Sequence, residues 1–176
     1  KLMIELLILY IVLKRDFTMY AIQKGIESEF APFTRPSFGA LKPALRRLEF
    51  NGFISTRKMM SDGGKLSVYY SITKSGEKEL KRLILEKLSD NPLQFAANAR
   101  IKLSMAEILD KEERKELFFG IKSLAMSFKT AAESILNDEY TKKNFYQKII
   151  LDNTVCEYKN LITITEGFEK DNERNS

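Results

Sequence analysis

Apolar residues in the first fifty positions recur at helical spacing in three successive segments. Residues 2–14 are apolar on nearly every side, which predicts a deeply packed helix. Residues 19–29 carry a single apolar face, and Thr18 just before them is suited to cap the helix. A third helix is expected over residues 39–51, ended by Asn51-Gly52. Its inner stripe consists of Leu41, Leu45 and Leu48.

Strand-like spacing replaces helical spacing in the next stretch. Residues 54–59 and 66–72 are predicted to be two strands, and the Asp-Gly-Gly sequence between them is typical of a β-hairpin turn. Another helix is expected to start within residues 73–76. Asp90-Asn91-Pro92 then breaks the pattern. This break predicts two domains, residues 1–90 and 91–176.

Residues 92–168 are predicted to be almost entirely helical, in segments of about 92–109, 110–137 and 140–168, with a frayed polar tail from residue 169. Asp110 and Glu113 have the spacing of a capping box. The second of these helices carries a heptad seam, the spacing by which two helices pair along their length. Such a seam closes a hairpin within one chain equally well. Its residues are Leu117, Ile121, Leu124, Phe128, Ala131 and Ile135. The last helix has one stripe of Leu151, Val155, Tyr158 and Ile162, beside another of Phe145, Ile149 and Cys156.

Helix, helix, short loop, helix and β-hairpin is the element order of a winged helix-turn-helix. The expected fold is therefore mainly α, with a small β-hairpin wing and an α-helical C-terminal domain. In a winged helix the third helix enters the DNA major groove and the hairpin tip forms the wing. Groove reading requires hydrogen-bond donors on that helix and cations for the flanking phosphates. The candidate DNA contacts on these two elements are Ser37, Lys42, Arg46, Arg47, Arg57, Lys58 and Lys65.

The formal charge of this 176-residue chain is +5, and the positive charge is concentrated in its first half. Residues 1–90 hold 16 Lys and Arg against 10 Asp and Glu, a balance of +6, whereas residues 91–176 hold 13 against 14, a balance of −1. A positive excess in one half favours a polyanionic partner for that half. Charge alone also fits a winged helix that binds an acidic protein, which is the main alternative.

Composition removes several other classes of function. The chain has no histidine, so Ser/His/Asp and Cys/His nucleophilic sites are excluded, and nothing in the sequence indicates a metal or a cofactor. Its one cysteine, Cys156, cannot form an intrachain disulfide, which fits a reducing compartment. The apolar run that starts at Leu2 contains Glu5 and is too short to span a membrane. We therefore expect a cytoplasmic protein that is not an enzyme.

Three segments of the first half resemble the PadR family of transcriptional regulators. Gly39-Ala-Leu-Lys-Pro-Ala-Leu-Arg-Arg-Leu-Glu49 is similar to the family's recognition-helix pattern, and Gly52-Phe53 follows it as in that pattern. Met19-Tyr20-Ala21-Ile22 resembles a family Met-Tyr-Gly-Tyr segment, which adds Tyr20 to the candidate DNA contacts. Downstream, Gly64, the segment from Tyr69 to Thr73 and Gly76 match a further family segment. The resemblance covers residues 2 to about 88 and, more loosely, the helical remainder.

The resemblance implies a homodimer that represses transcription from a pseudo-palindromic DNA site, with a small aromatic effector. It also implies that the C-terminal helices pair between subunits. The expected interface residues are Leu117, Ile121, Leu124, Phe128, Leu151, Val155, Tyr158 and Ile162. Two departures lie at the DNA-facing start of the third helix, where Lys42 replaces the family's usual Tyr and Ala40 replaces a common Ser. The operator sequence therefore cannot be inferred from relatives.

Overall fold

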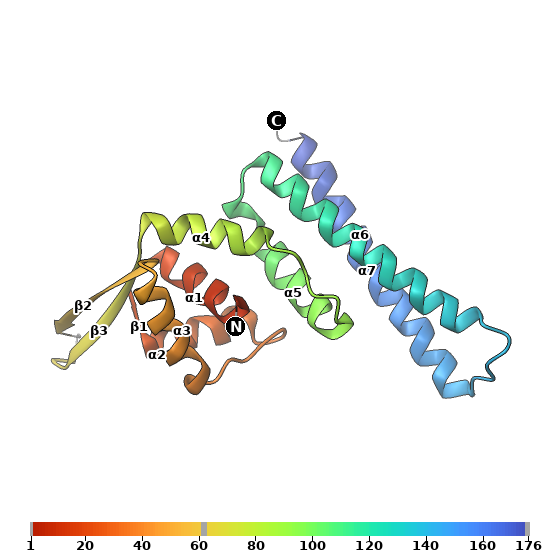
Figure 1. The fold of residues 1–176 in the computed structure, drawn as a ribbon, viewed down its shortest axis with the longest axis horizontal. Coiled ribbons are helices and arrows are strands. Elements are labelled where there is room, and N and C mark those ends of the chain that lie inside the picture. The colour runs from red at the N-terminus through yellow and green to blue at the C-terminus, as the bar shows by residue number, and fades with distance from the viewer. Residues whose placement is uncertain (1, 61–62, 175–176) are drawn as a thin grey trace. The chain divides into compact units, whose positions relative to one another are not determined.

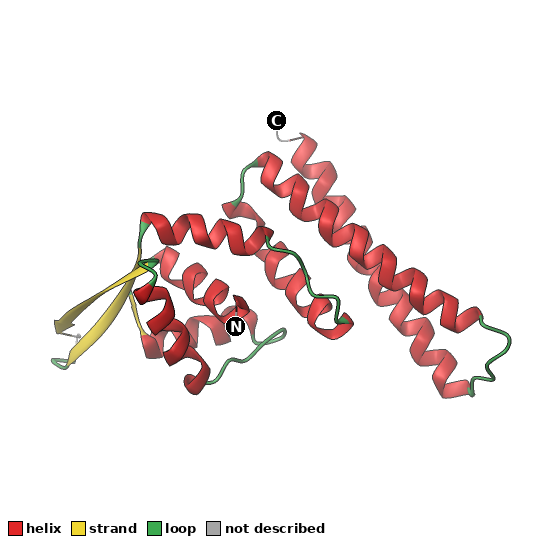
Figure 2. Ribbon diagram, in the orientation of Figure 1, coloured by secondary structure: helices red, strands yellow, loops and turns green. Residues whose placement is uncertain are grey.

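The computed structural model describes residues 2–60 and 63–174 (Figures 1 and 2). Helices dominate these residues, and the strands form one small antiparallel sheet, which confirms the predicted fold class. Within the described part of the chain, no helix combines the length and the apolar character that crossing a membrane requires. The elements in chain order are α1 (Leu2–Lys14), β1 (Phe17–Thr18), α2 (Met19–Phe30), α3 (Phe38–Phe50), β2 (Ile54–Met60), β3 (Leu66–Ile72), α4 (Lys74–Leu85), α5 (Pro92–Ser104), the 3-10 helix η1 (Ala106–Ile108), α6 (Lys111–Asn137) and α7 (Phe145–Arg174).

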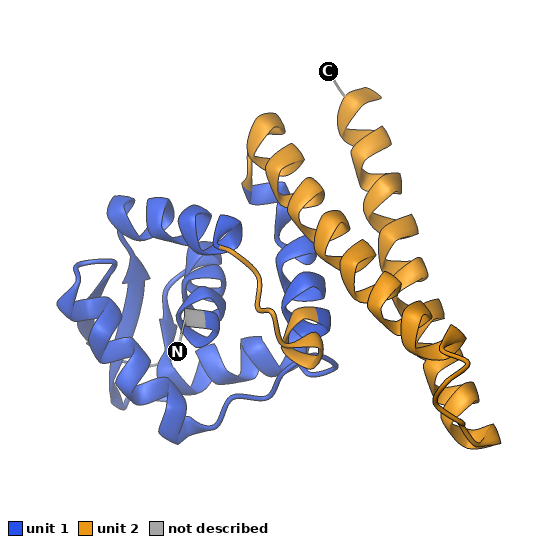
Figure 3. Cartoon of the chain, turned by 45° about the vertical axis from the view of Figure 1, so that its right-hand side comes forward, with its two compact units in different colours: residues 1–86, 96–108 blue, residues 87–95, 109–176 orange. Residues whose placement is uncertain are grey.

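The chain divides into two compact units (Figure 3). The first unit comprises residues 1–86 and 96–108, and the second comprises residues 87–95 and 109–176. All three strands lie in the first unit, whereas the second is helical. The proposed domain boundary at residues 90–92 stays a prediction.

Helix α1 forms the centre of the first unit. Residues 6–12 are all buried, because α2, α3 and α4 pack around the helix. This arrangement explains why α1 is apolar on nearly every side. Helix α2 directs its predicted apolar face inward, and Thr18 caps it by accepting a hydrogen bond from the Ala21 N–H at 3.3 Å. Both predictions for α2 are confirmed.

The sheet has the strand order β1-β3-β2. Strands β2 and β3 pair from Ile54↔Ile72 at the base to Met60↔Leu66 near the tip, as the predicted hairpin requires. Strand β1 adds two residues on the other side of β3, and it was not predicted because two residues show no periodicity. The turn prediction falls partly on residues 61 and 62, which lie outside the described residues. Gly64, just after them, has a φ of +72°, a conformation that favours glycine.

The end of α3 is joined closely to the start of α4. Gly52, with a φ of +70°, ends α3 by donating to the Glu49 carbonyl at 2.9 Å, while the next N–H, of Phe53, donates to the Leu48 carbonyl at 2.9 Å. These two bonds form a Schellman motif. Thr73 caps α4 and also donates to the Gly52 carbonyl at 2.7 Å. A side chain at Gly76 would overlap the Phe53 carbonyl oxygen, so the joint requires glycine there.

Pro43 lies in the second turn of α3. The helix begins at Phe38, with Ser37 as its N-cap. Proline at this position removes a hydrogen bond to the Gly39 carbonyl four residues earlier. Both Gly39 and Pro43 are exposed. Water can therefore satisfy the carbonyl, and the helix continues.

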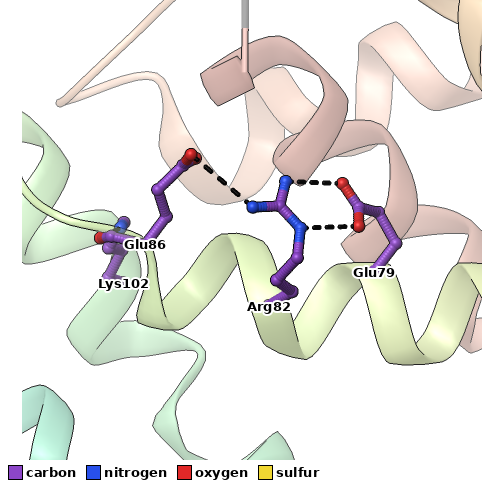
Figure 4. A network of polar contacts seen from close by, with 4 residues as sticks. All are labelled: Glu79, Arg82, Glu86 and Lys102. Atoms are coloured by element: carbon purple, nitrogen blue, oxygen red, sulfur yellow. Dashed lines mark hydrogen bonds and ion pairs between the residues drawn. The ribbon is translucent and has the colours of Figure 1, made fainter.

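Polar side chains interact with one another along α4 and at its C-terminal end (Figure 4). Arg82 makes two parallel hydrogen bonds of 2.8 Å to the Glu79 carboxylate, and a longer ion pair of 3.6 Å to Glu86. Lys102 of α5 is only 4% exposed, and its ammonium donates to the Glu86 backbone carbonyl. Burial away from water lowers the pKa of Lys102 from 10.5 to about 8, against the opposing attraction of the Glu86 carboxylate.

Helices α6 and α7 pack against each other as an antiparallel hairpin (Figure 1). The predicted capping box of Asp110 and Glu113 starts α6 and is confirmed. Helix α7 starts later than predicted, at Phe145, because Asn144 and Gln147 cap it with reciprocal bonds of 2.9 Å. The predicted helix of residues 92–109 is interrupted after Ser104 and continues as η1.

The prediction that the chain frays from residue 169 is wrong, because α7 continues to Arg174. Asn172 holds this last turn in place. Its side-chain oxygen accepts from Arg114 Nε at 2.7 Å, and its amide donates to the Lys111 carbonyl at 3.1 Å. The polar sequence is thus fixed by a buried hydrogen-bonded side chain instead of by apolar packing.

Candidate nucleic-acid interface

The outer side of α3 carries two of the predicted DNA contacts. Lys42 and Arg46 are four residues apart and therefore lie on the same flank, and both are exposed. The opposite side is buried through Leu41, Leu45 and Leu48. Ser37 is exposed at the helix start, and its hydroxyl makes no capping bond. The predicted orientation of α3 is therefore confirmed by burial, and its exposed flank presents two cations and a hydroxyl.

Arg47 lies on a different flank of α3. Its guanidinium Nε is 2.6 Å from a carboxylate oxygen of Glu5 in α1, and the Glu5 side chain is only 14% exposed. This ion pair ties α3 to the central helix of the unit. The structure therefore does not bring Arg47 together with Lys42 and Arg46. Its DNA contact stays a prediction, and its observed partner is an acidic side chain.

The wing carries three further predicted contacts, which are all exposed. Arg57 forms an ion pair with Asp16, just before β1. Lys58, the next residue on β2, points to the other face of the hairpin because successive strand residues alternate. Lys65 lies near the tip, directly after Gly64. The wing also exposes several apolar side chains, namely Met59, Met60, Leu66 and Val68.

A hydrogen bond connects α3 to the wing. Glu49, near the end of α3, accepts from the Thr56 hydroxyl of β2 at 2.7 Å. Thr56 pairs with Tyr70 of β3 across the sheet. Burial raises the pKa of the Tyr70 hydroxyl, the Glu49 carboxylate raises it further, and Arg46 opposes them. Helix α3 and the wing are therefore linked at this point.

Tyr20 lies in the first turn of α2 and is 61% exposed. Its ring stacks on that of Phe38, with a centroid distance of 6.3 Å and an interplanar angle of 16°. Phe38 is itself 41% exposed at the first position of α3. Sequence reasoning missed Phe38, because its spacing of three residues from Leu41 and seven from Leu45 extends the leucine stripe and favours a buried position.

The predicted dimer residues contribute to the α6–α7 hairpin of a single chain. Leu117, Ile121, Val155 and Tyr158 are buried, while Leu124, Phe128, Leu151 and Ile162 are half-buried. The Phe128 ring lies 5.1 Å from that of Phe95 and 5.6 Å from that of Tyr158. Their pairing between subunits stays a prediction. The neighbouring apolar side chains that remain exposed are Phe119, Met126, Phe145, Ile149, Ile164 and Phe168.

A pocket of about 520 Å³ lies at the end of this hairpin, where α6 leads into α7. Its walls are largely apolar, with Lys142, Lys143 and the amides of Asn144 and Gln147 supplying polar groups. The ammonium of Lys143 donates to the Asp138 and Thr141 carbonyls at 2.8 and 3.0 Å. Phe118 and Phe128 lie outside the lining of this pocket and pack against other aromatic rings. In the described residues, His, Cys, Asp and Glu side chains form no group of three that could hold a metal ion.

Comparisons with known proteins place the first unit in a family. The model of the Transcriptional regulator PadR-like family matches residues 8–82. A comparison with curated proteins gives no match. Among solved structures, the smu.1704 protein of Streptococcus mutans is 38% identical, and the match covers 47% of this chain and 73% of that one with a TM-score of 0.42. A PadR family transcription regulator from Clostridium difficile is 30% identical, with 45% and 80% covered and a TM-score of 0.39.

A third solved structure matches nearly the whole chain at lower identity. It is PadR of Bacillus subtilis in complex with operator DNA, which is 17% identical, with 96% of this chain and 97% of that one covered and a TM-score of 0.45.

Three helices followed by an antiparallel wing, with an exposed basic flank on the third helix, define a winged helix-turn-helix protein. Within that class, the chain belongs to the PadR-like family of transcriptional regulators. Members of this family are regulators of transcription and not enzymes, so the prediction that the chain is not an enzyme is confirmed.

Proposed function

We propose that the chain is a DNA-binding repressor that acts as a homodimer on a pseudo-palindromic operator. The observation that carries this proposal is the exposed flank of α3. Lys42 and Arg46 project from it away from the buried leucines, and the exposed Ser37 hydroxyl, which makes no capping bond, lies at the helix start. A helix in the major groove needs this combination of cations and hydrogen-bond donors for phosphates and base edges.

In this proposal the wing has the smaller electrostatic role. Arg57 already pairs with Asp16, which reduces its charge toward a phosphate. Lys58 and Lys65 are the other wing cations, and they lie among exposed apolar side chains. We therefore assign most of the phosphate contacts to α3 and expect the wing to contribute less to the salt dependence of binding.

Dimerisation is assigned to the second unit. The half-buried residues of the predicted interface keep part of their apolar surface in solvent, and exposed side chains of the neighbouring stripe on α7 extend it. These half-buried residues are Leu124 and Phe128 of α6 and Leu151 and Ile162 of α7. Phe145 is 70% exposed and Ile149 is 52% exposed on that stripe. Exposed apolar side chains that lie together on one face are typical of an interaction site. Two subunits joined there present two α3 helices to a site with two-fold symmetry.

The pocket at the end of the hairpin is the candidate place for a small-molecule effector. Its volume lies within the range of small-ligand sites, and its apolar walls with a few polar groups suit an aromatic compound. Tyr146 and Ile150 supply apolar contacts, and the Lys142 ammonium supplies a cation for a ligand carboxylate. A ligand bound there would lie next to the exposed stripe through which we propose that the subunits pair.

The test compares duplex DNA with an acidic polypeptide as partner. Fluorescently labelled random-sequence duplex and poly-glutamate are titrated with the protein at several salt concentrations. We expect duplex binding with an affinity that falls steeply with salt, because phosphate contacts release counterions. The DNA proposal fails if poly-glutamate binds as well as the duplex or if no duplex binds at low salt. Either result favours a winged helix that recognises an acidic protein.

A further inference from the structure

Tyr20 and Phe38 form a stacked aromatic pair on the exposed surface at the start of α3. The two rings lie nearly parallel, at 16°, and remain 61% and 41% exposed. Single exposed apolar residues are ordinary in folded proteins. Two large rings held together at the start of a recognition helix are different, because each fixes the orientation of the other and together they offer a flat apolar surface.

Phe38 also belongs to the row of side chains that faces the proposed partner. Residues four apart on a helix lie on one flank, so Phe38, Lys42 and Arg46 follow one another over successive turns. All three are exposed. The N-terminal residues of a recognition helix are the ones that contact base edges. The row therefore presents an apolar ring where base edges are read, followed by two cations.

We propose that Phe38 contacts the C5-methyl group of thymine in the major groove and is a specificity-determining residue. Tyr20 acts as a positioning residue, since its stacked ring limits the orientations of the Phe38 ring. Among the four unmodified bases, thymine alone presents a methyl group in the major groove, and phenylalanine is one of the side chains suited to contact it. This inference rests on the proposed DNA-binding function and names the base that this part of α3 reads.

The experiment replaces thymine by deoxyuracil, which lacks only the methyl group and keeps all base-pairing groups. The duplex most enriched by the wild-type protein from a randomised library serves as the probe. Each thymine is replaced in turn, and affinities are measured at one salt concentration. We expect the wild type to bind about four-fold more weakly when the contacted methyl group is absent, as for one buried methyl group. Phe38→Ala should bind the two duplexes equally.

Two further variants separate the contact from general effects on the helix. Phe50→Ala removes another exposed aromatic ring of α3, which is 92% exposed at the far end of the helix, and should keep the four-fold difference. Tyr20→Phe keeps the stacked ring and should also keep it, whereas Tyr20→Ala should reduce it. Circular dichroism verifies that each variant is folded.

The outcomes distinguish this inference from the proposed function beneath it. If the wild type enriches a duplex but discriminates thymine from deoxyuracil at no position, the methyl contact is disproved and DNA binding stands. The same holds if Phe38→Ala keeps the wild-type difference. If no duplex is enriched, the DNA-binding proposal fails and the methyl contact fails with it.

Discussion

The contribution of a single charge to DNA binding should be measurable at Lys42. It is exposed on the outer flank of α3, so its removal should leave the core unchanged. We expect Lys42→Ala to lower the slope of log K against log salt by about one unit, the effect of one lost phosphate contact. Unfolding by urea should be unchanged. Lys159→Ala, which removes an exposed lysine from α7, is the charge-matched control and should keep the wild-type slope.

Replacing Arg47, in contrast, should lower the stability of the folded chain. Because Arg47 pairs with the largely buried Glu5 at 2.6 Å, Arg47→Ala leaves that carboxylate without its partner. We expect the free energy of unfolding to fall by roughly 1 kcal/mol. A double-mutant cycle with Glu5→Gln measures the coupling between the two side chains. Additive effects in that cycle would show that the ion pair contributes nothing to stability.

These two residues also show what the sequence can and cannot predict at this scale. The exposed position of Lys42 follows from its place relative to the leucine stripe, because helical geometry is local. The partner of Arg47 is 42 residues away in sequence, and only the folded chain brings the two together. The exposure of Phe38 and its stacking on Tyr20 likewise depend on how α2 meets α3, because helical spacing alone places Phe38 in line with the leucine stripe.

Helix α5 is joined to the end of α4 through a buried ammonium, and this contact makes stability depend on pH. The pKa of Lys102 is lowered to about 8 in the folded chain, against 10.5 when it is exposed. Below pH 8 the lysine is charged in both states, and the folded state bears the full cost of burying it. Between pH 8 and 10.5 the unfolded chain holds a proton that the folded chain has released. Stability therefore rises with pH in this interval.

Lys102→Met removes this titration while keeping an apolar stem of similar size. The free energy of unfolding of the wild type relative to Lys102→Met should increase between pH 8 and 10, by at most about 1.4 kcal/mol per pH unit. Urea unfolding of both proteins at several pH values measures it, and groups common to the two proteins cancel in the difference. Parallel pH profiles would contradict the lowered pKa.

The regular elements of the first 72 residues were predicted well from sequence, whereas β1 and both ends of α7 were not. The boundaries of α2, α3 and the wing strands follow from periodicity and from caps such as Thr18 and Gly52. Strand β1 escapes prediction because its pairing with β3 is long-range. The final turn of α7 escapes it because Asn172 holds that turn through bonds to α6. Both depend on contacts that no local pattern encodes.

The assembly of two subunits can be tested at the whole-molecule scale with a surface residue of the second unit. Ile149 is 52% exposed on the stripe beside the α6–α7 contact, so an aspartate there should leave the folded subunit unchanged. In a dimer interface the same carboxylate would be buried without a partner, at a cost of several kcal/mol. We expect Ile149→Asp to give folded monomers, detected by sedimentation and circular dichroism.

Leu124→Asp is the matched comparison. Leu124 is half-buried in α6, and its replacement should destabilise the hairpin as well as the dimer. A folded dimer of Ile149→Asp would move the interface away from this stripe. A folded dimer of Leu124→Asp would exclude the predicted seam.

The close packing at Gly76 has a genetic consequence for a cell that carries a Gly76→Ala allele. Alanine at this position would collide with the Phe53 carbonyl and disturb the joint between α3, the wing and α4, while the second unit would be unaltered. Such a subunit would lose the reading surface but keep the proposed pairing surface. In a cell that expresses both alleles, the Gly76→Ala subunit would pair with intact subunits and form mixed dimers with a single working α3. Increased expression of a repressed reporter gene would measure this loss of repression. A Gly76→Ala allele should therefore be dominant over the wild-type gene, although the variant protein itself has lost a function.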